Sequence, residues 1–183
     1  MRIISGNNKG RKINAPKTLP VRPTTDFAKE SLFNIINNNF DYENIDVLDL
    51  FSGTGCISYE FASRGARSVI AVERSFKCID FINKTVYEIR FSNVKVIRAN
   101  VFSFLNTITK KFDLIFADPP YSMPKIEKVS ELVFSNNILK KNGCLILEHS
   151  DKSSFSDHKY FLKQRNYGSV NFSFLSEDQS FRF

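Results

Sequence analysis

Five short apolar runs, separated by longer amphipathic stretches, organise the middle of the chain. Each run is apolar at consecutive positions, which is typical of strands that are buried on both faces of a sheet. The stretches between the runs have the spacing of helices that cover such a sheet. This pattern predicts an α/β fold with a parallel sheet. The expected strands span residues 45–51, 68–73, 94–97, 112–117 and 143–148, and the expected helices run to about residue 64, over 75–91, after 100 and over about 125–139.

The two ends of the chain have a different pattern. Near the C-terminus, strand-like residues flank the turn signal at 166–168 and predict an antiparallel hairpin on one edge of the sheet. Near the N-terminus, residues 2–5 and 11–13 flank a Gly/Asn cluster and predict a small hairpin with a basic tip. A proline-rich linker follows, and a helix is expected to begin at residues 24–26. We therefore divide the chain into an extension, residues 1–23, and a main domain, residues 24–183.

Length and composition limit the possible classes of protein. A chain of 183 residues that is 42% hydrophobic fits one domain with a sizeable core and argues against disorder. No apolar run is long enough for a membrane span, and the first residues lack the apolar core of a signal peptide. Three scattered cysteines favour neither a disulfide framework nor a zinc site, so we expect no metal and a cytoplasmic protein. We also expect a monomer, because no long exposed apolar helix stands out.

The net charge of +7 is concentrated at one end. Six of the 26 Lys and Arg residues lie within residues 1–25, which contain no Asp or Glu, so the rest of the chain is nearly neutral. A short basic segment of this kind usually has an anionic partner, most often a nucleic acid. The alternative is a solvated tail.

The first candidate site is the glycine-containing sequence DLFSGTG at residues 49–55, between the first expected strand and its helix. Glycines here allow a ligand to approach the backbone, and a helix N-terminus offers free N–H groups. Glu73 ends the next expected strand, where an acid can accept hydrogen bonds from ribose hydroxyls. A nicotinamide dinucleotide would fit the same geometry, but the GxGxxG pattern is absent, since Ser58 stands at the third glycine position. A plain strand-to-helix turn is the remaining alternative.

The second candidate site is Asp118-Pro119-Pro120-Tyr121, at the end of the fourth expected strand. An exocyclic amine on a base is a poor nucleophile, and it needs acceptors that orient its N–H bonds and oppose the developing positive charge. The Asp118 carboxylate and the Pro119 carbonyl can supply them, and two prolines would fix both in advance. Tyr121 offers a ring on which an unstacked base can lie. The alternative is a structural turn with a buried tyrosine.

Together these motifs resemble those of class I S-adenosylmethionine-dependent amino-methyltransferases. With the sequence RPTTD at residues 22–26, ESLFN at 30–34 and the initial RIISG…GR, the chain is similar to the RsmD family of 16S ribosomal RNA guanine-N2 methyltransferases. The resemblance implies a Rossmann-like, mostly parallel seven-stranded sheet and S-adenosylmethionine as cofactor. It also implies 16S rRNA, naked or within an assembled small subunit, as partner, with guanine 966 as the target by analogy.

The resemblance also implies roles for individual residues. Around the cofactor it places Asp118 and the residues Thr24, Thr25, Asp49, Phe51, Ser52, Gly53, Thr54, Gly55, Glu73, Asn100 and Val101. Asn100 stands where many relatives have Asp, and its carbonyl would accept from the adenine amine. Thr24 and Thr25 could equally cap a helix. The residues expected to grip RNA are Arg2, Lys9, Arg11, Lys12 and Arg22.

Three other functions stay open at this point. An adenine-N6 methyltransferase shares the DPPY motif, although 183 residues leave no room for the separate target-recognition domain usual in DNA enzymes of that type. A nicotinamide-dependent reductase would leave the DPPY motif unexplained. A non-catalytic RNA-binding protein with a decayed site would not be expected to keep all the candidate acids and Tyr121.

Overall fold

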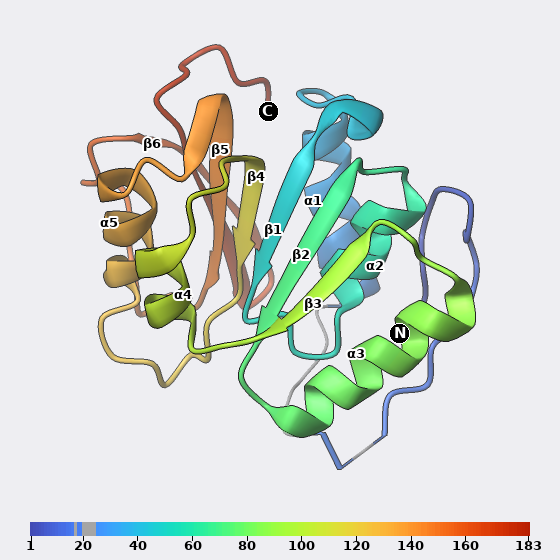
Figure 1. Cartoon of the computed structure of the whole chain (residues 1–183). Helices are drawn as coiled ribbons and strands as arrows, with labels where there is room; N and C mark the ends of the chain where they lie inside the picture. The colour runs from blue at the N-terminus through green and yellow to red at the C-terminus, as the bar shows by residue number, and fades with distance from the viewer. Residues whose placement is uncertain (17, 20–24) are drawn as a thin grey trace.

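The computed structural model describes residues 1–16, 18–19 and 25–183, and it confirms the predicted fold class. The described residues form one seven-stranded sheet in the order β3-β2-β1-β4-β5-β7-β6 (Figure 1). Strands β1 to β5 are parallel, and β7 pairs antiparallel with both β5 and β6. The strands are β1 Asp46–Leu50, β2 Ser68–Glu73, β3 Val94–Arg98, β4 Phe112–Ala117, β5 Leu139–His149, β6 Phe161–Tyr167 and β7 Val170–Leu175.

Helices cover both faces of the sheet, with α1, α2 and α3 on one face and α4 and α5 on the other (Figure 1). The helices are α1 Asp26–Asn37, α2 Cys56–Ser63, α3 Phe76–Ile89, α4 Val101–Thr107 and α5 Glu127–Ser135, with a short 3-10 helix at Tyr42–Asn44.

Alternate side chains of the central strands enter two separate cores. On β1, Val47 packs in the core with α1, α2 and α3, whereas Leu48 and Leu50 pack in the core with α4 and α5. Because both faces of the strand are covered, every residue of β1 is buried. Each fully buried apolar side chain of the strand contributes about 1.5–3 kcal/mol relative to exposure. The consecutive apolar runs in the sequence are the direct result of this two-sided burial.

Most predicted element boundaries agree with the structure to within two residues, but the helix expected over about 125–139 is wrong at its C-terminal end. Helix α5 stops at Ser135, and Asn137 adopts a positive φ of 52° that ends the helical path. Strand β5 then begins at Leu139, four residues before the predicted start at 143, and Leu139 pairs with Phe112 of β4. Pairing with the central sheet therefore prevails over the local helical pattern.

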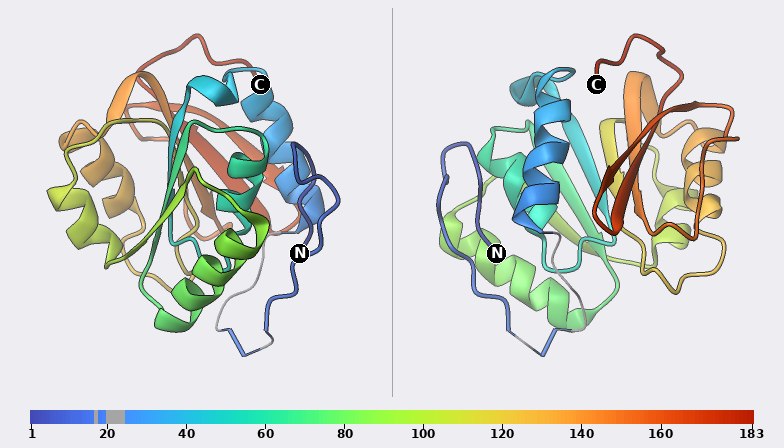
Figure 2. Two further views of the ribbon diagram at one scale, coloured as in Figure 1. Left: turned by 45° about the vertical axis from the view of Figure 1, so that its right-hand side comes forward. Right: turned by 180° about the vertical axis from the view of Figure 1, so that it is seen from behind.

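The N-terminal segment packs against the main domain (Figure 2). The expected hairpin is reduced to one antiparallel bridge between Arg2 and Lys12, supported by backbone hydrogen bonds. Its tip lies on α2 so closely that a Cβ on Gly6 would meet the Ser63 carbonyl oxygen at 1.9 Å. The fully buried Glu60 carboxylate accepts from two backbone N–H groups of this segment, at 2.9 and 3.0 Å. The fold thus gives residues 1–13 of the basic segment a defined position.

Candidate active site

Acidic side chains gather at the carboxyl edge of the sheet, where the strand order reverses. Strand β1 lies between β2 and β4, so the connections leaving β1 and β4 run to opposite faces. Ligands of open α/β sheets bind at such a point. Asp49 on β1, Glu73 on β2, Asp118 after β4 and Glu148 on β5 all lie at or near this edge. The fold therefore brings together acids that are up to 99 positions apart in the sequence.

The loop after β1 has an unusual backbone. Phe51, Gly53 and Gly55 all adopt positive φ, of 59°, 55° and 79°. For a bulky residue such as Phe51 this conformation is strained, and strain of this kind is concentrated at ligand sites. A Cβ on Gly55 would lie 2.7 Å from the Tyr59 ring, so a side chain cannot be added there without moving the ring. Ser52 fixes the turn, because its hydroxyl donates to the Asp49 carbonyl at 2.8 Å.

Asp49 is almost completely buried. The Ser58 hydroxyl donates to its carboxylate at 2.5 Å, but among the residues that the structure describes no lysine or arginine pairs with it. Burial raises the pKa of Asp49 to about 7, and the hydrogen bond from Ser58 only partly opposes that effect. The site therefore holds an acid that a cationic ligand could ionise at neutral pH.

Backbone N–H groups hold Glu73 in place. Its carboxylate accepts from Gly53 of the glycine loop at 2.9 Å, from Arg74 at 2.8 Å and from Ser75 at 2.7 Å. These bonds tie the end of β2 to the loop after β1. A carboxylate offers about four acceptor positions, so Glu73 retains capacity for a ligand hydroxyl.

Two other predicted cofactor residues are helix caps. The Thr25 hydroxyl accepts from the Ala28 N–H at 3.2 Å, which confirms the capping alternative for that residue. The Asn100 side chain accepts from the first-turn N–H groups of Phe102 and Ser103, at 3.0 and 3.2 Å. Asn100 is exposed beside the buried Val101, and its contact with adenine stays a prediction. Thr24 and Arg22 lie outside the described residues.

The segment Asp118–Tyr121 leaves β4 beside the glycine loop. The Asp118 N–H donates to the Leu50 carbonyl at 3.4 Å and so continues the hydrogen bonding between β4 and β1. Pro119 is buried and Pro120 is exposed. Burial and the neighbouring Glu148 and Asp49 raise the pKa of Asp118 well above its usual range. Tyr121 is 55% exposed, so its ring is accessible and the alternative of a buried structural tyrosine is wrong.

Sequence reasoning missed Glu148. It is only 4% exposed, and its carboxylate accepts from the Tyr121 hydroxyl at 3.5 Å. Leu147 pairs with Ala117, so the next residues along these parallel strands, Glu148 and Asp118, are neighbours. The available signal was an acid at the end of an apolar run, the pattern by which Glu73 was found.

A groove separates the basic N-terminal segment from α3. The residues Arg2, Lys9, Arg11 and Lys12 are all exposed, and Arg2 lies 3.6 Å from Asp26. The groove has a volume of about 580 Å³ and is lined by Arg11 and Lys12 on one side and by Lys77 and Lys84 on the other. Helix α3 also contributes Asp80 and Glu88, so the lining of the groove is mixed in charge, with four basic residues and two acidic ones.

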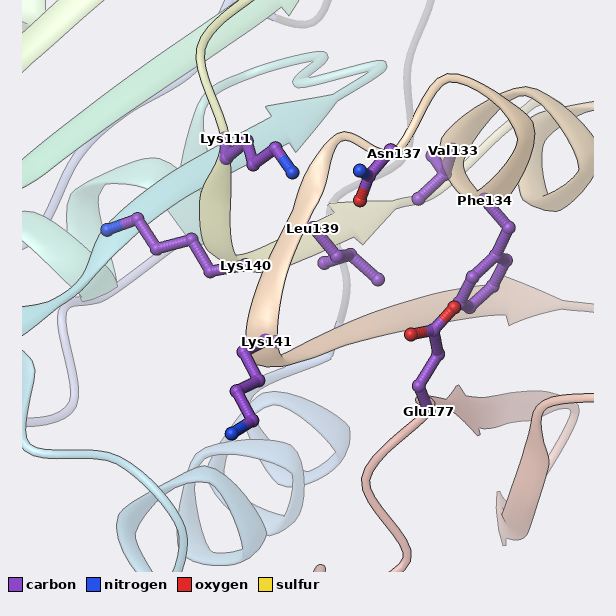
Figure 3. A pocket seen from close by; sticks show the side chains of 9 residues that line it. Lys111, Val133, Phe134, Asn137, Leu139, Lys140, Lys141 and Glu177 are labelled. Atoms are coloured by element: carbon purple, nitrogen blue, oxygen red, sulfur yellow. The ribbon is translucent and has the colours of Figure 1, made fainter.

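A second cavity, of about 420 Å³, lies near the amino ends of β4 and β5 and contains none of the predicted site residues. Figure 3 shows Lys140 and Lys141 extending away from the apolar Leu139. Among the described residues there is no group of three or more His, Cys, Asp or Glu that could hold a metal ion. None of the described helices has both the length and the apolar character to cross a membrane.

Comparison with known proteins identifies the family to which the chain belongs. The model of a family described as "Conserved hypothetical protein 95" matches residues 1–176. The chain belongs to the RsmD family. The ribosomal RNA small subunit methyltransferase D of Buchnera aphidicola (subsp. Baizongia pistaciae) is 36% identical over 151 residues, covering 82% of this chain and 76% of that protein. The protein of the same name from Haemophilus influenzae is 30% identical, covering 94% and 91%.

A solved structure confirms the RsmD-family fold over nearly the whole chain. The structure of yhhF from Escherichia coli superposes with a TM-score of 0.82 at 26% identity, covering 95% of this chain and 96% of that one. The family model, which matches residues 1–176, includes both the carboxyl edge of the sheet and the N-terminal segment.

Proposed function

We propose that this RsmD-family protein transfers a methyl group from S-adenosylmethionine to the exocyclic N2 amine of a guanine in 16S rRNA, at guanine 966 by analogy with the family. The observation that carries the proposal is the position of Asp118–Tyr121, which follows β4 directly beside the strained glycine loop after β1. This juxtaposition supports the proposal, because the acceptors for an amine would lie next to the proposed cofactor site. The names of the relatives given above support rRNA as the substrate.

The residues at the carboxyl edge fit S-adenosylmethionine. That cofactor carries a sulfonium and an ammonium group, and it supplies an electrophilic methyl when it is bound. The buried Asp49, with a pKa of about 7, would ionise beside such a cation. Glu73 keeps acceptor capacity for the ribose, and the first N–H groups of α4, at Val101, suit the adenine. The rigid loop at residues 51–55 would set the position of the methionine part.

The DPPY segment would then prepare the nucleophile. The carboxylate of Asp118 and the carbonyl of Pro119 each accept one N–H bond of the guanine N2 amine, which directs the nitrogen lone pair at the methyl group. Both acceptors oppose the positive charge that develops on nitrogen. Tyr121 stacks on the unstacked base. The raised pKa of Asp118 makes its carboxylate a suitable acceptor for the proton that the amine finally loses.

The basic segment would hold the RNA. The exposed residues Arg11 and Lys12 face Lys77 and Lys84 across the groove, an arrangement that suits a phosphate backbone. The Thr54 hydroxyl lies 3.7 Å from the sulfur of Met1, so the segment also touches the glycine loop. RNA bound along this segment would therefore lie close to the cofactor loop.

A methylation assay tests the proposal. The protein is incubated with S-adenosylmethionine labelled in the methyl group and with 16S rRNA, naked or in assembled 30S particles, and the nucleosides of the product are analysed. We expect N2-methylguanosine. N6-methyladenosine would support the second candidate, adenine-N6 methylation, which shares the DPPY motif, and absence of S-adenosylmethionine binding would exclude both.

A further inference from the structure

The residue Glu148 occupies a position that the proposed mechanism does not use. It is nearly fully buried on β5, next to Asp118 on the adjoining strand, and it contacts the Tyr121 hydroxyl. Burying a second carboxyl beside Asp118 is unfavourable, because the charge of Glu148 disfavours the ionisation of Asp118. An acid kept in such a place is a candidate for recognition of a ligand with several hydrogen-bond donors.

The edge of guanine has such a set of donors. Its N1–H and its N2 amine are adjacent and point in the same direction, whereas adenine presents a bare N1 acceptor beside its N6 amine. Carboxylates only accept hydrogen bonds. When both are ionised, two neighbouring carboxylates therefore match the guanine edge, and one of them would face the lone pair of N1 if adenine entered.

We propose that Glu148 accepts the N1–H of the target guanine, while Asp118 and the Pro119 carbonyl hold the N2 amine. This inference rests on the proposed function and deepens it, because it assigns the choice of guanine over adenine to a single side chain. A site built around such a hydrogen bond rejects analogues that lack the donor, because the bare N1 then faces a carboxylate oxygen with no hydrogen between the two acceptors.

The test uses a short RNA in which the target guanine is replaced by 2-aminopurine, which keeps the amine but has no N1–H. For the unmodified protein we expect kcat/KM to fall about 10- to 100-fold on this RNA. The variant Glu148→Gln has an amide that can donate to a bare N1, so it should lose activity on guanine and reverse the preference. Equal rates of the unmodified protein on both RNAs would overturn the proposal, whether or not the variant folds.

A matched variant separates base recognition from the support of Tyr121. Tyr121→Phe removes the hydroxyl that contacts Glu148 but leaves the carboxylate in place. We expect it to keep the preference for guanine over 2-aminopurine even if its rate falls. If Tyr121→Phe and Glu148→Gln change the preference equally, Glu148 acts only by holding the tyrosine and the proposal fails. A protein that methylates adenine and not guanine would instead contradict the proposed function itself.

Discussion

Two aspartates of strand β1, three residues apart, have opposite electrostatic environments. Asp46 lies at the amino edge of the sheet, where Arg67, Lys110 and Lys140 all form ion pairs with it. Partial burial alone would raise its pKa, but hydrogen bonds from these cations hold the pKa of Asp46 well below its usual range. Asp49 lies toward the carboxyl edge and receives only hydroxyl and backbone hydrogen bonds, so burial raises its pKa to about 7.

Strand β4 repeats the contrast. Asp113, near its amino end, accepts from Lys140 at 2.7 Å and from the backbone of Asp46. Asp118, just beyond its carboxyl end, has a raised pKa and, among the described residues, no cationic partner. Where carboxylates serve the fold, the chain supplies its own cations. Asp49 and Asp118 have no cationic partner among the described residues, and the proposed ligands, which are cationic or donate hydrogen bonds, would offset the cost of burying them.

The largest expected effect is on the catalytic rate, and it comes from comparing Asp118 with Asp113. Asp118→Ala should lower kcat by about 10³-fold, because it removes a positioned acceptor from the reaction, while binding of S-adenosylmethionine survives. Asp113→Ala should keep the catalytic rate of the folded protein and lower its free energy of unfolding. Kinetics and urea denaturation on both variants check this. If both variants lost activity to the same extent, the contrast between a structural amino edge and a functional carboxyl edge of the sheet would be wrong.

On β1, the substitution Asp49→Asn should stabilise the cofactor-free protein while it abolishes tight cofactor binding. The folded-state pKa is raised, so burial favours the protonated form, and the stability of the unmodified protein falls as pH rises from about 4 to 7. The variant lacks this fall. The free energy of unfolding of the variant should therefore exceed that of the unmodified protein by an amount that grows over this pH range and levels off above pH 7, at roughly 2–4 kcal/mol. Urea denaturation at several pH values measures it, and a variant less stable at pH 8 would refute it.

The matched substitution Asp46→Asn should act in the opposite direction. It leaves Arg67, Lys110 and Lys140 facing one another across a neutral group, and we expect the free energy of unfolding to fall by about 2–3 kcal/mol at pH 7. The pKa of Asp46 is lowered in the folded protein, so its contribution is complete above about pH 4 and is lost as pH falls further. The difference between the two proteins should therefore shrink as pH falls below about 4, and it should vanish only below the lowered pKa of Asp46 in the folded protein. A constant difference at all pH values would point to lost packing.

These pairs also show what the sequence could and could not reveal. The strands that carry these aspartates or end just before them were predictable, because two-sided burial makes their apolar runs continuous. The role of Asp118 was predicted from the DPPY motif and that of Asp49 from the family resemblance, and both stay predictions. The partners of Asp46 were not predictable, because Lys110 and Lys140 come from distant positions that meet only when β1, β4 and β5 align. The position of Glu148 beside Asp118 likewise depends on the register of two strands.

The smallest expected effect concerns the cations themselves. Arg11 and Lys12 are exposed at the groove and form no ion pair among the described residues, whereas Lys140 is bound to two aspartates. The double variant Arg11→Ala/Lys12→Ala should make the dependence of RNA affinity on salt shallower by about 1.5–2 in log–log slope, because two fewer phosphates are neutralised. Its stability should not change. Lys140→Ala should show the reverse, a less stable protein with the original salt slope. An unchanged slope in the double variant would remove these two residues from the RNA contact and leave the basic segment without its proposed partner.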